Sequence, residues 1–457
     1  MKAAQIAIRI SAVHWQELRN QIFTDDGNEN AAVLVCSESA NNGFITLLVR
    51  EIVSASPAEY LVRESHHLEV SPRYYNRIID RCLGTGTSVM IVHSHPHNDE
   101  AWYSKSDDYG ESRLLPILQS LLPNSIVGSL VVSLKSVAGR WYADRQLRSL
   151  ESVVITGNRA SKTRLGMHED ESRRDGRFDR QIRAIGLGNQ NLLNELKIAI
   201  VGVGGTGSLV AEQMARIGVQ DVLLVDADMV EDSNVTRIFG SNASSIGKSK
   251  VRVAEEHLRR LGASKAKGIE GSVVSQHILM KLRDRDMCFG CVDNHLARSV
   301  LNRFAHQYLI PLVDMGIRID AREGFVSSAA GRVSVVGAGM VCMRCSQHIN
   351  AERVYAESLP ENERSDLARE GYAMGIDDPV PSITSMNTTI AGLGVTACLN
   401  LFVNLTGDLQ PLDQLYDAKS GVVFTANPAH VKNCDVCDPI SGVVAIGDSQ
   451  IVSAYDS

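Results

Sequence analysis

Apolar residues recur along the first third of the chain in patterns that predict alternating strands and helices. The runs "AAVLVCS", "GFITLLVREIV" and "SVMIVHSHP" are short and rich in aliphatic and β-branched residues, which favours buried strands. "YGESRLLPILQSLL" spaces its apolar residues as an amphipathic helix does, and "SIVGSLVVSLK" followed by "VAGRWYAD" predicts a hairpin. The pattern therefore predicts one α/β domain over residues 1–157.

The pattern changes at "NRASKTRLGMHEDESRRDG", which is charged and poor in apolar residues and predicts a linker or a long surface helix over residues 158–175. Beyond it, "KIAIVGVGG", "GSLVAEQMARIGV" and "DVLLVDAD" predict a strand, a helix and a strand in succession. Parallel α/β character continues through "DMCFGCVDN" and "IPLVDMGI". We therefore expect a Rossmann-like second domain over residues 176–445 and a C-terminal tail over residues 446–457.

The composition narrows the class of protein. The chain has 457 residues, of which 44% are hydrophobic and 22% charged, as is typical of a soluble globular protein. The formal net charge of -7 argues against nucleic acid or an anionic membrane as the main partner. By this pattern no apolar run reaches the length of a membrane span, and the first residues lack the apolar core of a signal peptide, so we expect a cytoplasmic protein.

Two histidines end one of the predicted strands. His93 and His95 are separated by one residue, so their side chains share a face of the strand and can reach the same ion. Asp107 can add an oxygen ligand and leave the fourth position of a tetrahedral Zn²⁺ ion open to water. Such a water needs a general base, and Glu29 in "ENAAVLV" is our candidate.

These residues resemble the JAB/MPN metalloprotease family, whose JAMM pattern is an upstream Glu, then HxH, seven residues and SxxD. Here "HSH" supplies the histidines and "SKSD" supplies the last motif. The resemblance covers residues 1–157 and implies that the histidines and Asp107 bind zinc, that Glu29 activates the water and that Ser104 supports the tetrahedral oxyanion. Glu38 and Glu51 remain alternatives for the base.

The chain departs from this pattern at two places. Eight residues, rather than seven, separate His95 from Ser104, and Ala32 stands where many relatives have glycine. We expect the additional residue to bulge from the loop around Asn98. The alternative is that this half is a scaffold of the same fold that binds a partner without metal.

The stretch "GVGGTG" lies between a predicted strand and a predicted helix, where glycines let the backbone approach phosphate groups. Its glycines are Gly202, Gly204, Gly205 and Gly207. Asp226 follows Gly202 by 24 residues and ends the next strand, where it can bond a ribose hydroxyl. Taken alone, this arrangement would also fit an oxidoreductase that binds NAD.

Polar residues beyond the second strand favour a triphosphate instead. Asn234, Arg237 and Lys250 supply an amide and two cations, which can stabilise the charge on a departing pyrophosphate. Asp293 ends a later strand in "CFGCVDN" and can hold Mg²⁺ through oxygen.

The runs "RFDRQI", "GVGGTG", "VDADMVEDSNVTR", "GKSK" and "VDN", with the later CxxC pairs, resemble the ThiF/MoeB family of ubiquitin-activating-type adenylating enzymes over residues 175–440. The resemblance implies that ATP is bound with its ribose on Asp226, its phosphates near the three polar residues above and its magnesium on Asp293. It also implies that Arg180 reaches the ATP of a neighbouring subunit, and hence a homodimer.

Four of the nine cysteines form two CxxC pairs, Cys342 with Cys345 and Cys434 with Cys437. In a cytosolic protein such pairs indicate metal binding or redox work, and we favour zinc over a redox dithiol. The ThiF/MoeB resemblance implies that the two pairs close one structural Cys₄ zinc site. Members that form a thioester carry a cysteine after the first pair, but none lies between Ser346 and Ala397.

Cys398 follows in the apolar run "TTIAGLGVTACLNLFVNL" and is interpreted as a core residue. We therefore expect adenylation of a carboxylate, with transfer to a thiol on another protein. Together the two resemblances predict a bifunctional enzyme of a prokaryotic ubiquitin-like modifier pathway. One half would adenylate the modifier's C-terminal glycine, and the other would cleave the peptide or isopeptide bond after it, by trimming or deconjugation.

The expected partners are a ubiquitin-like or sulfur-carrier protein with a C-terminal glycine, and a conjugating-type enzyme or a sulfur donor. Two alternatives remain open at this point. The adenylate can instead receive sulfur for the synthesis of a cofactor or thio-metabolite, and one half can serve as a binding platform for the modifier without catalysis.

Overall fold

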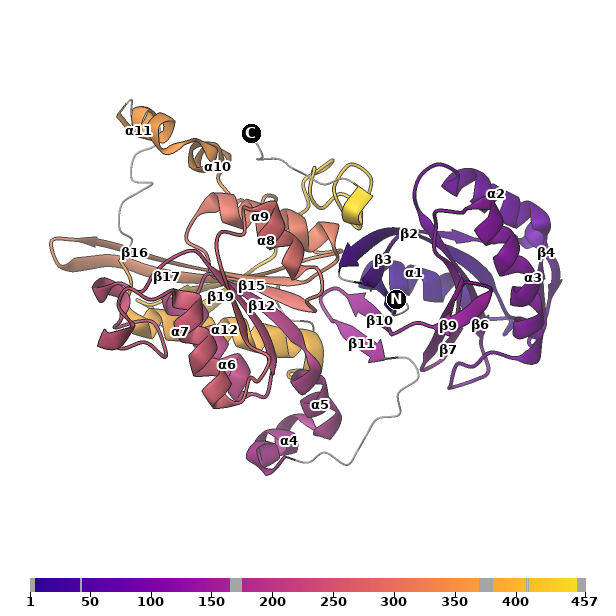
Figure 1. Cartoon of the computed structure of the whole chain (residues 1–457), viewed down its shortest axis with the longest axis horizontal. Helices are drawn as coiled ribbons and strands as arrows, with labels where there is room; N and C mark the ends of the chain where they lie inside the picture. The colour runs from indigo at the N-terminus through magenta and orange to yellow at the C-terminus, as the bar shows by residue number, and fades with distance from the viewer. Residues whose placement is uncertain are drawn as a thin grey trace. The chain divides into compact units, whose positions relative to one another are not determined.

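A computed structural model describes residues 5–41, 43–164, 175–369, 381–407, 409 and 411–449. These residues form two compact units, the first made of residues 5–164 together with 444–449 and the second of residues 175–443. Each unit contains a large sheet of its own with helices packed on it, so the predicted α/β class is confirmed (Figure 1).

The sheet of the first unit has nine strands in the order β11-β10-β1-β3-β2-β6-β7-β8-β9. Strand β1 pairs parallel with β3 and β10, and β6 pairs parallel with β7, whereas the remaining pairs are antiparallel. The strands are β1 (Gln5–Ser11), β2 (Ala31–Asn41), β3 (Phe44–Ser54), β6 (Ser88–His95), β7 (Val127–Ser133), β8 (Val137–Ala143), β9 (Gln146–Ser149), β10 (Ser152–Thr156) and β11 (Ser161–Arg164).

Strand β2 shows why the apolar runs are continuous rather than alternating. Ala32, Leu34 and Cys36 point into a core on one face of the sheet, and Val33 and Val35 point into a second core on the other face. A strand that is covered on both faces needs apolar residues at every position. The predicted strands β2, β3 and β6, and the β7–β8 hairpin, are confirmed.

The two cores of the first unit lie under different helices. Leu18 and Ile22 of α1 (Ala12–Ile22) belong to the first core, and Tyr74 and Ile78 of α2 (Pro72–Cys82) belong to the second. The helix predicted from "YGESRLLPILQSLL" is confirmed as α3 (Lys105–Leu121). A short turn and a small ribbon complete the unit, namely η1 (Pro57–Glu59), β4 (Tyr60–Arg63) and β5 (Leu68–Val70).

Two expectations at the ends of the units need correction. The start of the expected linker over 158–175 forms β11, which pairs antiparallel with β10, because an edge strand of a sheet does not need a run of apolar residues. Residues 165–174 of that linker lie outside the described residues. The start of the expected tail over 446–457 forms η6 (Gly447–Ser449), which packs on β2 of the first unit. Residues 450–457 of that tail lie outside the described residues. There the Ala40 N–H donates to Asp448 Oδ2 at 2.9 Å.

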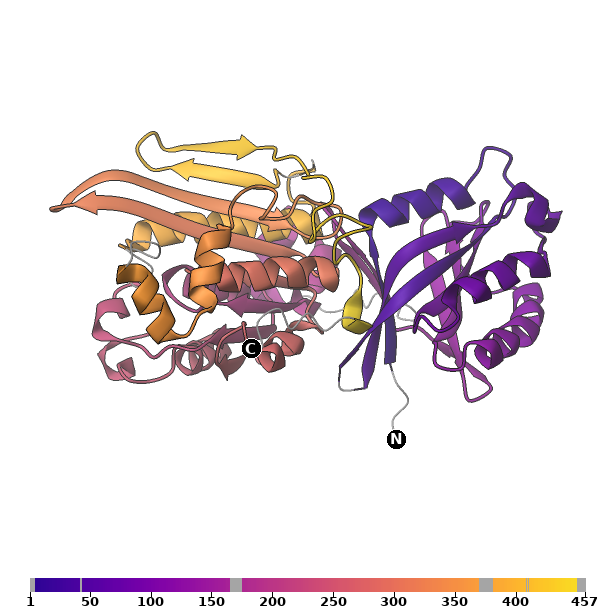
Figure 2. The same ribbon diagram turned by 90° about the horizontal axis from the view of Figure 1, so that it is seen from above.

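The sheet of the second unit has eight strands in the order β14-β13-β12-β15-β16-β17-β18-β19. The first five of these are mutually parallel, and from β16 to β19 each strand is antiparallel to the next. Figure 2 shows β16 and β17 as long adjacent strands. The strands are β12 (Lys197–Val201), β13 (Asp221–Asp226), β14 (Lys267–Glu270), β15 (Met287–Gly290), β16 (Leu312–Arg322), β17 (Phe325–Val336), β18 (Asp413–Asp417) and β19 (Val422–Ala426).

Helices cover both faces of this sheet, with α6, α7 and α12 on one face and α8 and α9 on the other (Figure 1). The predicted succession of β12, α6 and β13 is confirmed. The helices are α4 (Asp179–Ile185), α5 (Leu187–Glu195), α6 (Gly205–Arg216), α7 (Lys250–Leu261), α8 (Gln276–Leu279), α9 (His295–Gln307), α10 (Ala351–Ser358), α11 (Glu361–Arg369) and α12 (Thr384–Val403), with the single turns η2 (Gly176–Phe178), η3 (Asp232–Asn234), η4 (Ala243–Ser245) and η5 (Met280–Leu282).

Helix α12 corrects the expectation that no segment is long and apolar enough to cross a membrane. The helix is long and apolar enough to cross a membrane by length and composition alone, but 67% of its apolar stretch is buried within the protein. It packs on α6 and on strands β16 and β17. Its apolar residues therefore serve the core of the second unit.

Candidate functional site

The first group of polar residues lies where β6 ends and α3 begins. His93 and His95 lie on one face of β6, and Nε2 of His93 is 3.1 Å from Oδ1 of Asp107. Ser104 is the N-cap of α3: its Oγ accepts from the Asp107 N–H at 3.1 Å, and its own N–H donates to Asp107 Oδ2 at 2.6 Å. This reciprocal cap fixes the carboxylate of Asp107 toward the histidines.

Glu29 joins this group from β2's side. Ala31 pairs with His93 in the antiparallel β2–β6 register. Glu29, two residues before Ala31, therefore lies opposite His95. Glu29 is 8% exposed, and its Oε1 lies 3.8 Å from Nε2 of His95. Burial raises the pKa of Glu29 to about 7, against the opposing effect of the His93 charge. A carboxyl with such a pKa can accept a proton near neutral pH.

The two alternative bases have other partners. The Ser88 hydroxyl donates to Glu38, and Glu51 pairs with Arg81 at 2.6 Å. The structure therefore brings Glu29, and neither alternative, to the histidines.

The additional residue of the loop does not disturb this group. The Asn98 N–H donates to the His95 carbonyl at 3.3 Å, so the turn expected at Asn98 is present. The loop does not bulge freely, because the Asn98 and Asp99 carbonyls accept from the backbone N–H groups of Leu134 and Lys135 at 3.0 and 3.1 Å. Hydrogen bonds to the β7–β8 turn hold the loop in place while the ligand side chains still converge.

The residues of this group fit a zinc ion. One donor atom each from His93, His95 and Asp107 lies within 4.8 Å of the others. Nδ1 of His95 is buried and has no hydrogen-bond partner in the part of the chain that the structure describes. Although burial alone would raise it, His93 and Ser104 hold the pKa of Asp107 at about 2, so this ligand is an anion. Two imidazoles and one carboxylate suit Zn²⁺ with one position open.

The second group lines a cavity of about 1060 Å³ in the second unit. The glycine turn between β12 and α6 forms one wall. Gly202 has a φ of +87°, and a Cβ there would lie 2.5 Å from the Cys291 carbonyl oxygen. A Cβ on Gly207 would lie 1.8 Å from the Gly202 carbonyl oxygen, so the turn closes only with glycine at both positions. Gly204 and Gly205 line the cavity.

Charged side chains from neighbouring elements surround the glycine turn. Asp226, at the end of β13, accepts from the Val203 and Asp228 N–H groups at 2.6 and 2.8 Å. Burial raises the pKa of Asp226, against these two donors. Lys250, the first residue of α7, pairs with Asp228 at 2.7 Å. Arg237 and Asp293 also line the cavity.

Three of the residues predicted for this site lie outside the cavity lining. Gly207 packs against the Gly202 carbonyl inside the turn, as described above. Asn234 is 5% exposed, and its Oδ1 accepts from the Glu231 N–H at 2.9 Å, so it braces η3. Arg180 is exposed on α4.

Sequence reasoning missed other residues that line the cavity, among them Arg298, Arg332 and His348. Arg298 lies within the first turns of the helix that follows "VDN", and this spacing is a local signal that could have found it. Arg332 and His348 come from β17 and from the segment after Cys345, and their sequence context carries no such signal.

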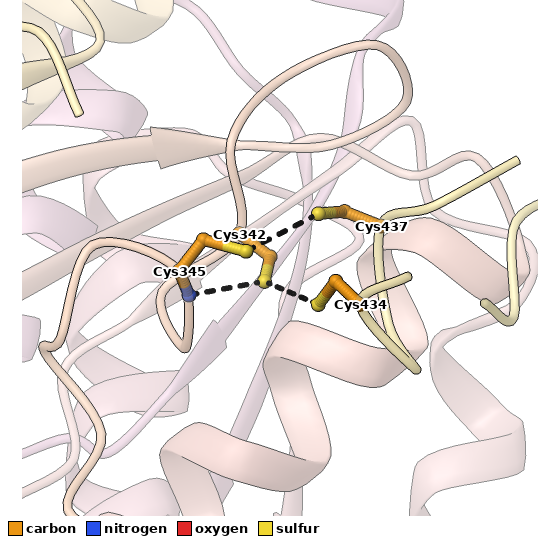
Figure 3. A group of neighbouring side chains, drawn as sticks. All are labelled: Cys342, Cys345, Cys434 and Cys437. Carbon is orange, nitrogen blue, oxygen red and sulfur yellow. Dashed lines mark hydrogen bonds between the residues drawn. The ribbon is translucent and has the colours of Figure 1, made fainter. Parts of the chain in front are cut away.

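The two CxxC pairs meet although they lie far apart in the sequence (Figure 3). Sγ of Cys342 is 3.7 Å from Sγ of Cys434, and Sγ of Cys345 is 3.6 Å from Sγ of Cys437. Sulfur atoms around a tetrahedral zinc ion, with bonds of about 2.3 Å, lie about 3.8 Å apart. The four cysteines therefore fit a structural zinc ion, and all four are buried.

The sequence pattern of the ThiF family matches residues 178–436, which is more than half of the chain. The chain belongs to the ThiF family. The ThiF match contains the glycine turn, Asp226, Lys250, Asp293 and the first CxxC pair.

Two curated proteins are similar to part of this ThiF chain. "Ubiquitin-like modifier-activating enzyme 5" of Oryza sativa subsp. japonica is 27% identical over 237 residues, which is 49% of this chain and 51% of the relative. "Adenylyltransferase and sulfurtransferase uba4" of Emericella nidulans is 31% identical over 169 residues, 37% of this chain and 35% of the relative. The chain thus spans about half the length of the first relative and about a third of the second.

A solved structure of E. coli MccB with ATP is also similar to the ThiF chain. Its identity is 17% and its TM-score 0.46, with 60% of this chain and 76% of MccB covered.

Proposed function

We propose that the chain uses ATP to adenylate the C-terminal carboxylate of a small ubiquitin-like or sulfur-carrier protein. The observation that carries the proposal is the convergence of the glycine turn, Asp226, Arg237, Lys250 and Asp293 on one cavity of a ThiF-family unit. The two curated relatives, named as a modifier-activating enzyme and as an adenylyltransferase and sulfurtransferase, support the same chemistry.

Each wall of the cavity suits one part of ATP. Backbone N–H groups at the start of α6 face phosphate, and the helix dipole favours its negative charge. Asp226, which already accepts two backbone N–H groups, is placed to bond a ribose hydroxyl. Lys250 can exchange its ion pair with Asp228 for a phosphate oxygen, and Arg237 adds a second cation.

The substrate carboxylate would attack the α-phosphorus of ATP, so that a new C–O–P bond forms and the bond to pyrophosphate breaks. Lys250 and Arg237 stabilise the charge that develops on the leaving group. The Asp293 carboxylate, which lines the cavity, would hold Mg²⁺, since oxygen donors suit this ion. Bound Mg²⁺ supplies further neutralisation of phosphate charge.

Transfer of the acyl group would use a thiol outside this chain's cavity. Burial raises the pKa of Cys398 to about 12, and this thiol is fully buried in α12. Cys291 lines the cavity, but burial raises its pKa as well. The acceptor is then the cysteine of a conjugating-type enzyme, or a sulfur donor as the second relative's name suggests.

Release of pyrophosphate on adding ATP and candidate modifiers tests this function. We expect Lys250→Ala to lower the rate at least about tenfold, because a charge-assisted contact to phosphate is lost. Arg260→Ala, on the exposed face of the same helix, is the matched control and should leave the rate unchanged. Release that is equal in the presence and absence of every modifier would contradict the proposal.

We also propose a homodimer in which Arg180 of one subunit reaches the ATP of the other. The exposure of Arg180 on α4, away from its own cavity lining, is compatible with that role. Mixing Arg180→Ala with Lys250→Ala subunits would create one intact site per mixed dimer and restore activity. Absence of any recovery in a verified mixed dimer would exclude the shared site.

A second candidate function belongs to the first unit, and the convergence of His93, His95, Asp107 and Glu29 favours it. We propose a zinc-dependent hydrolase of the JAB/MPN type that cleaves the peptide or isopeptide bond after the modifier's C-terminal glycine. The two histidines and Asp107 would hold zinc, which supplies a Lewis acid and an acidified water when bound. Glu29 takes the proton of the attacking water and passes it to the leaving amine.

The two proposed activities share one substrate tail. A fusion of both units keeps that tail at a high effective concentration near the second site after it leaves the first. Precursor trimming and deconjugation both satisfy this arrangement.

A further inference from the structure

A row of buried polar residues crosses three strands behind the cavity of the second unit. Asp314 of β16 pairs with Ser334 of β17, and Ser334 pairs with Asp413 of β18. Directly paired residues of neighbouring strands share a face of the sheet, so the three side chains lie side by side. They are 0%, 2% and 3% exposed, respectively.

One end of the row holds two cations of the cavity wall. Arg298 donates from Nε to both carboxylate oxygens of Asp314, at 3.3 and 3.2 Å. Arg332 donates from Nη2 to the same carboxylate and from Nη1 to the Ser334 hydroxyl. Both arginines line the cavity, so the buried Asp314 sets where their charges lie.

The other end of the row reaches His348. The Ser334 hydroxyl donates to Asp413 Oδ1 at 2.6 Å, and Asp413 Oδ2 lies 2.5 Å from Nε2 of His348. Because Ser334 accepts from Arg332, its single proton is committed to Asp413. Although burial alone would raise it, the bonds to His348 and Ser334 hold the pKa of Asp413 below its usual value, so Asp413 is an anion.

His348 belongs to the same compact turn as the first CxxC pair. The His348 N–H donates to the Met343 carbonyl at 2.8 Å, and the Ser346 N–H donates to the Cys342 carbonyl at 3.1 Å. On its other side the turn is fixed to α9, where Asn302 Oδ1 accepts from the Met343 N–H at 2.9 Å. His348 and the first CxxC pair therefore belong to one hydrogen-bonded turn.

We propose that Asp413 is a positioning residue that couples the turn carrying Cys342 and Cys345 to the Arg332 guanidinium in the nucleotide cavity. Metal binding at the four cysteines and ATP binding then strengthen each other. The inference rests on the proposed use of ATP. It assigns to the four-cysteine site an influence on the cavity in addition to holding the loops together.

The charge pattern supports coupling over a purely structural role. Buried ionic groups seldom add stability over apolar residues of the same size, but they do define geometry. Here Asp314 lies between the two cations Arg298 and Arg332. The hydroxyl of the neutral Ser334 links Arg332 to the anion Asp413. Moving one group leaves another buried charge without its partner, which is costly, so the row moves as a unit.

The coupling free energy between two binding sites is reciprocal, so the effect of ATP on zinc affinity measures the coupling between the cavity and the four cysteines. We would determine the zinc affinity of the four cysteines by chelator competition with and without ATP and Mg²⁺. The full chain would carry His93→Ala to remove the histidine group. Asp413→Asn and Ser334→Ala break the row, whereas Asp417→Asn, on the same strand and bonded to Ser420, is the matched control.

We expect ATP to raise the zinc affinity about tenfold in the parent and in Asp417→Asn, and less than about threefold in Asp413→Asn and Ser334→Ala. An equal effect in all four proteins, or none in the parent, would overturn the coupling. Direct ATP binding by the parent is measured in parallel. If the parent bound no ATP, the adenylation proposal itself would fail, which separates the two outcomes.

Discussion

The Sγ atoms of Cys342 and Cys434 lie 3.7 Å apart, although 92 residues separate them in the sequence. The chain between the two cysteines includes α12, β18 and β19. The contact therefore joins the two ends of a long segment of the second unit. Further polar groups contact the sulfur atoms: the Val431 N–H donates to Sγ of Cys345 at 3.3 Å, and Nδ1 of His430 lies 3.4 Å from Sγ of Cys437.

Replacement of Cys434 by serine should remove zinc from this site and destabilise the second unit. Loss of a structural metal leaves three thiols and two chain segments without their common anchor, and we expect the unfolding free energy to fall by at least about 3 kcal/mol. Zinc stoichiometry and urea unfolding measure the two effects. Cys291→Ala removes a thiol outside the cluster and should keep the zinc. Unchanged zinc content in Cys434→Ser would refute the four-cysteine assignment.

Ser104 offers a test of its position at the start of α3. Ser104→Ala removes the acceptor of the Asp107 N–H, and we expect a loss of about 1 kcal/mol in unfolding free energy together with weaker zinc binding by the first unit. Ser104→Thr keeps the cap and should retain both. If Ser104→Ala changed cleavage but neither stability nor zinc affinity, the hydroxyl would act on the reacting group rather than through Asp107.

Glu29→Gln should leave zinc bound and abolish cleavage of a modifier fusion, because an amide cannot take the proton of the attacking water. Adenylation by the second unit should continue at the native rate. Glu51→Gln is the matched control, since Glu51 pairs with Arg81 instead of the histidines. Cleavage by Glu29→Gln at the native rate would sink the assignment of the base.

His306 predicts a pH dependence of stability. Its ring is fully buried, and burial lowers its pKa to about 3, with a smaller effect of His430. The unfolded state therefore binds one more proton than the folded state between about pH 6.5 and pH 3, so acidification across this range destabilises the protein. The expected slope from this residue is about 1.4 kcal/mol per pH unit well below pH 6.5.

His306→Leu should remove that share of the slope. Urea unfolding of the native chain and the variant between pH 7 and pH 4 gives the difference in the pH dependence of the unfolding free energy. The contributions of the carboxyl groups, which both proteins share, cancel in this difference. Parallel curves across this range would mean that His306 is not buried in its neutral form.

Local spacing was enough to predict the residues that lie close together in the sequence. One residue between His93 and His95 places them on one face of β6, and the "GVGGTG" turn requires its glycines for steric reasons. The position of Glu29 depended on the pairing of β2 with β6, which the sequence indicates only through the start of an apolar run.

The row of Asp314, Ser334 and Asp413 could not be predicted in this way. These residues come from three strands, and only the register of β16, β17 and β18 brings them together. Strand register depends on the packing of the whole sheet rather than on local sequence. The return of residues 447–449 to β2 of the first unit is likewise a contact between distant segments, so a tail was expected instead.

ATP–pyrophosphate exchange with a candidate modifier tests the central claim most directly. The modifier would be supplied with its C-terminal glycine free, and in a second form with one residue added after that glycine. With the free tail we predict exchange in the native chain and a rate at least about tenfold lower in Lys250→Ala. With the extended tail we predict no exchange in a Glu29→Gln background, which cannot trim that tail. Exchange that does not depend on the free glycine carboxylate would contradict the account.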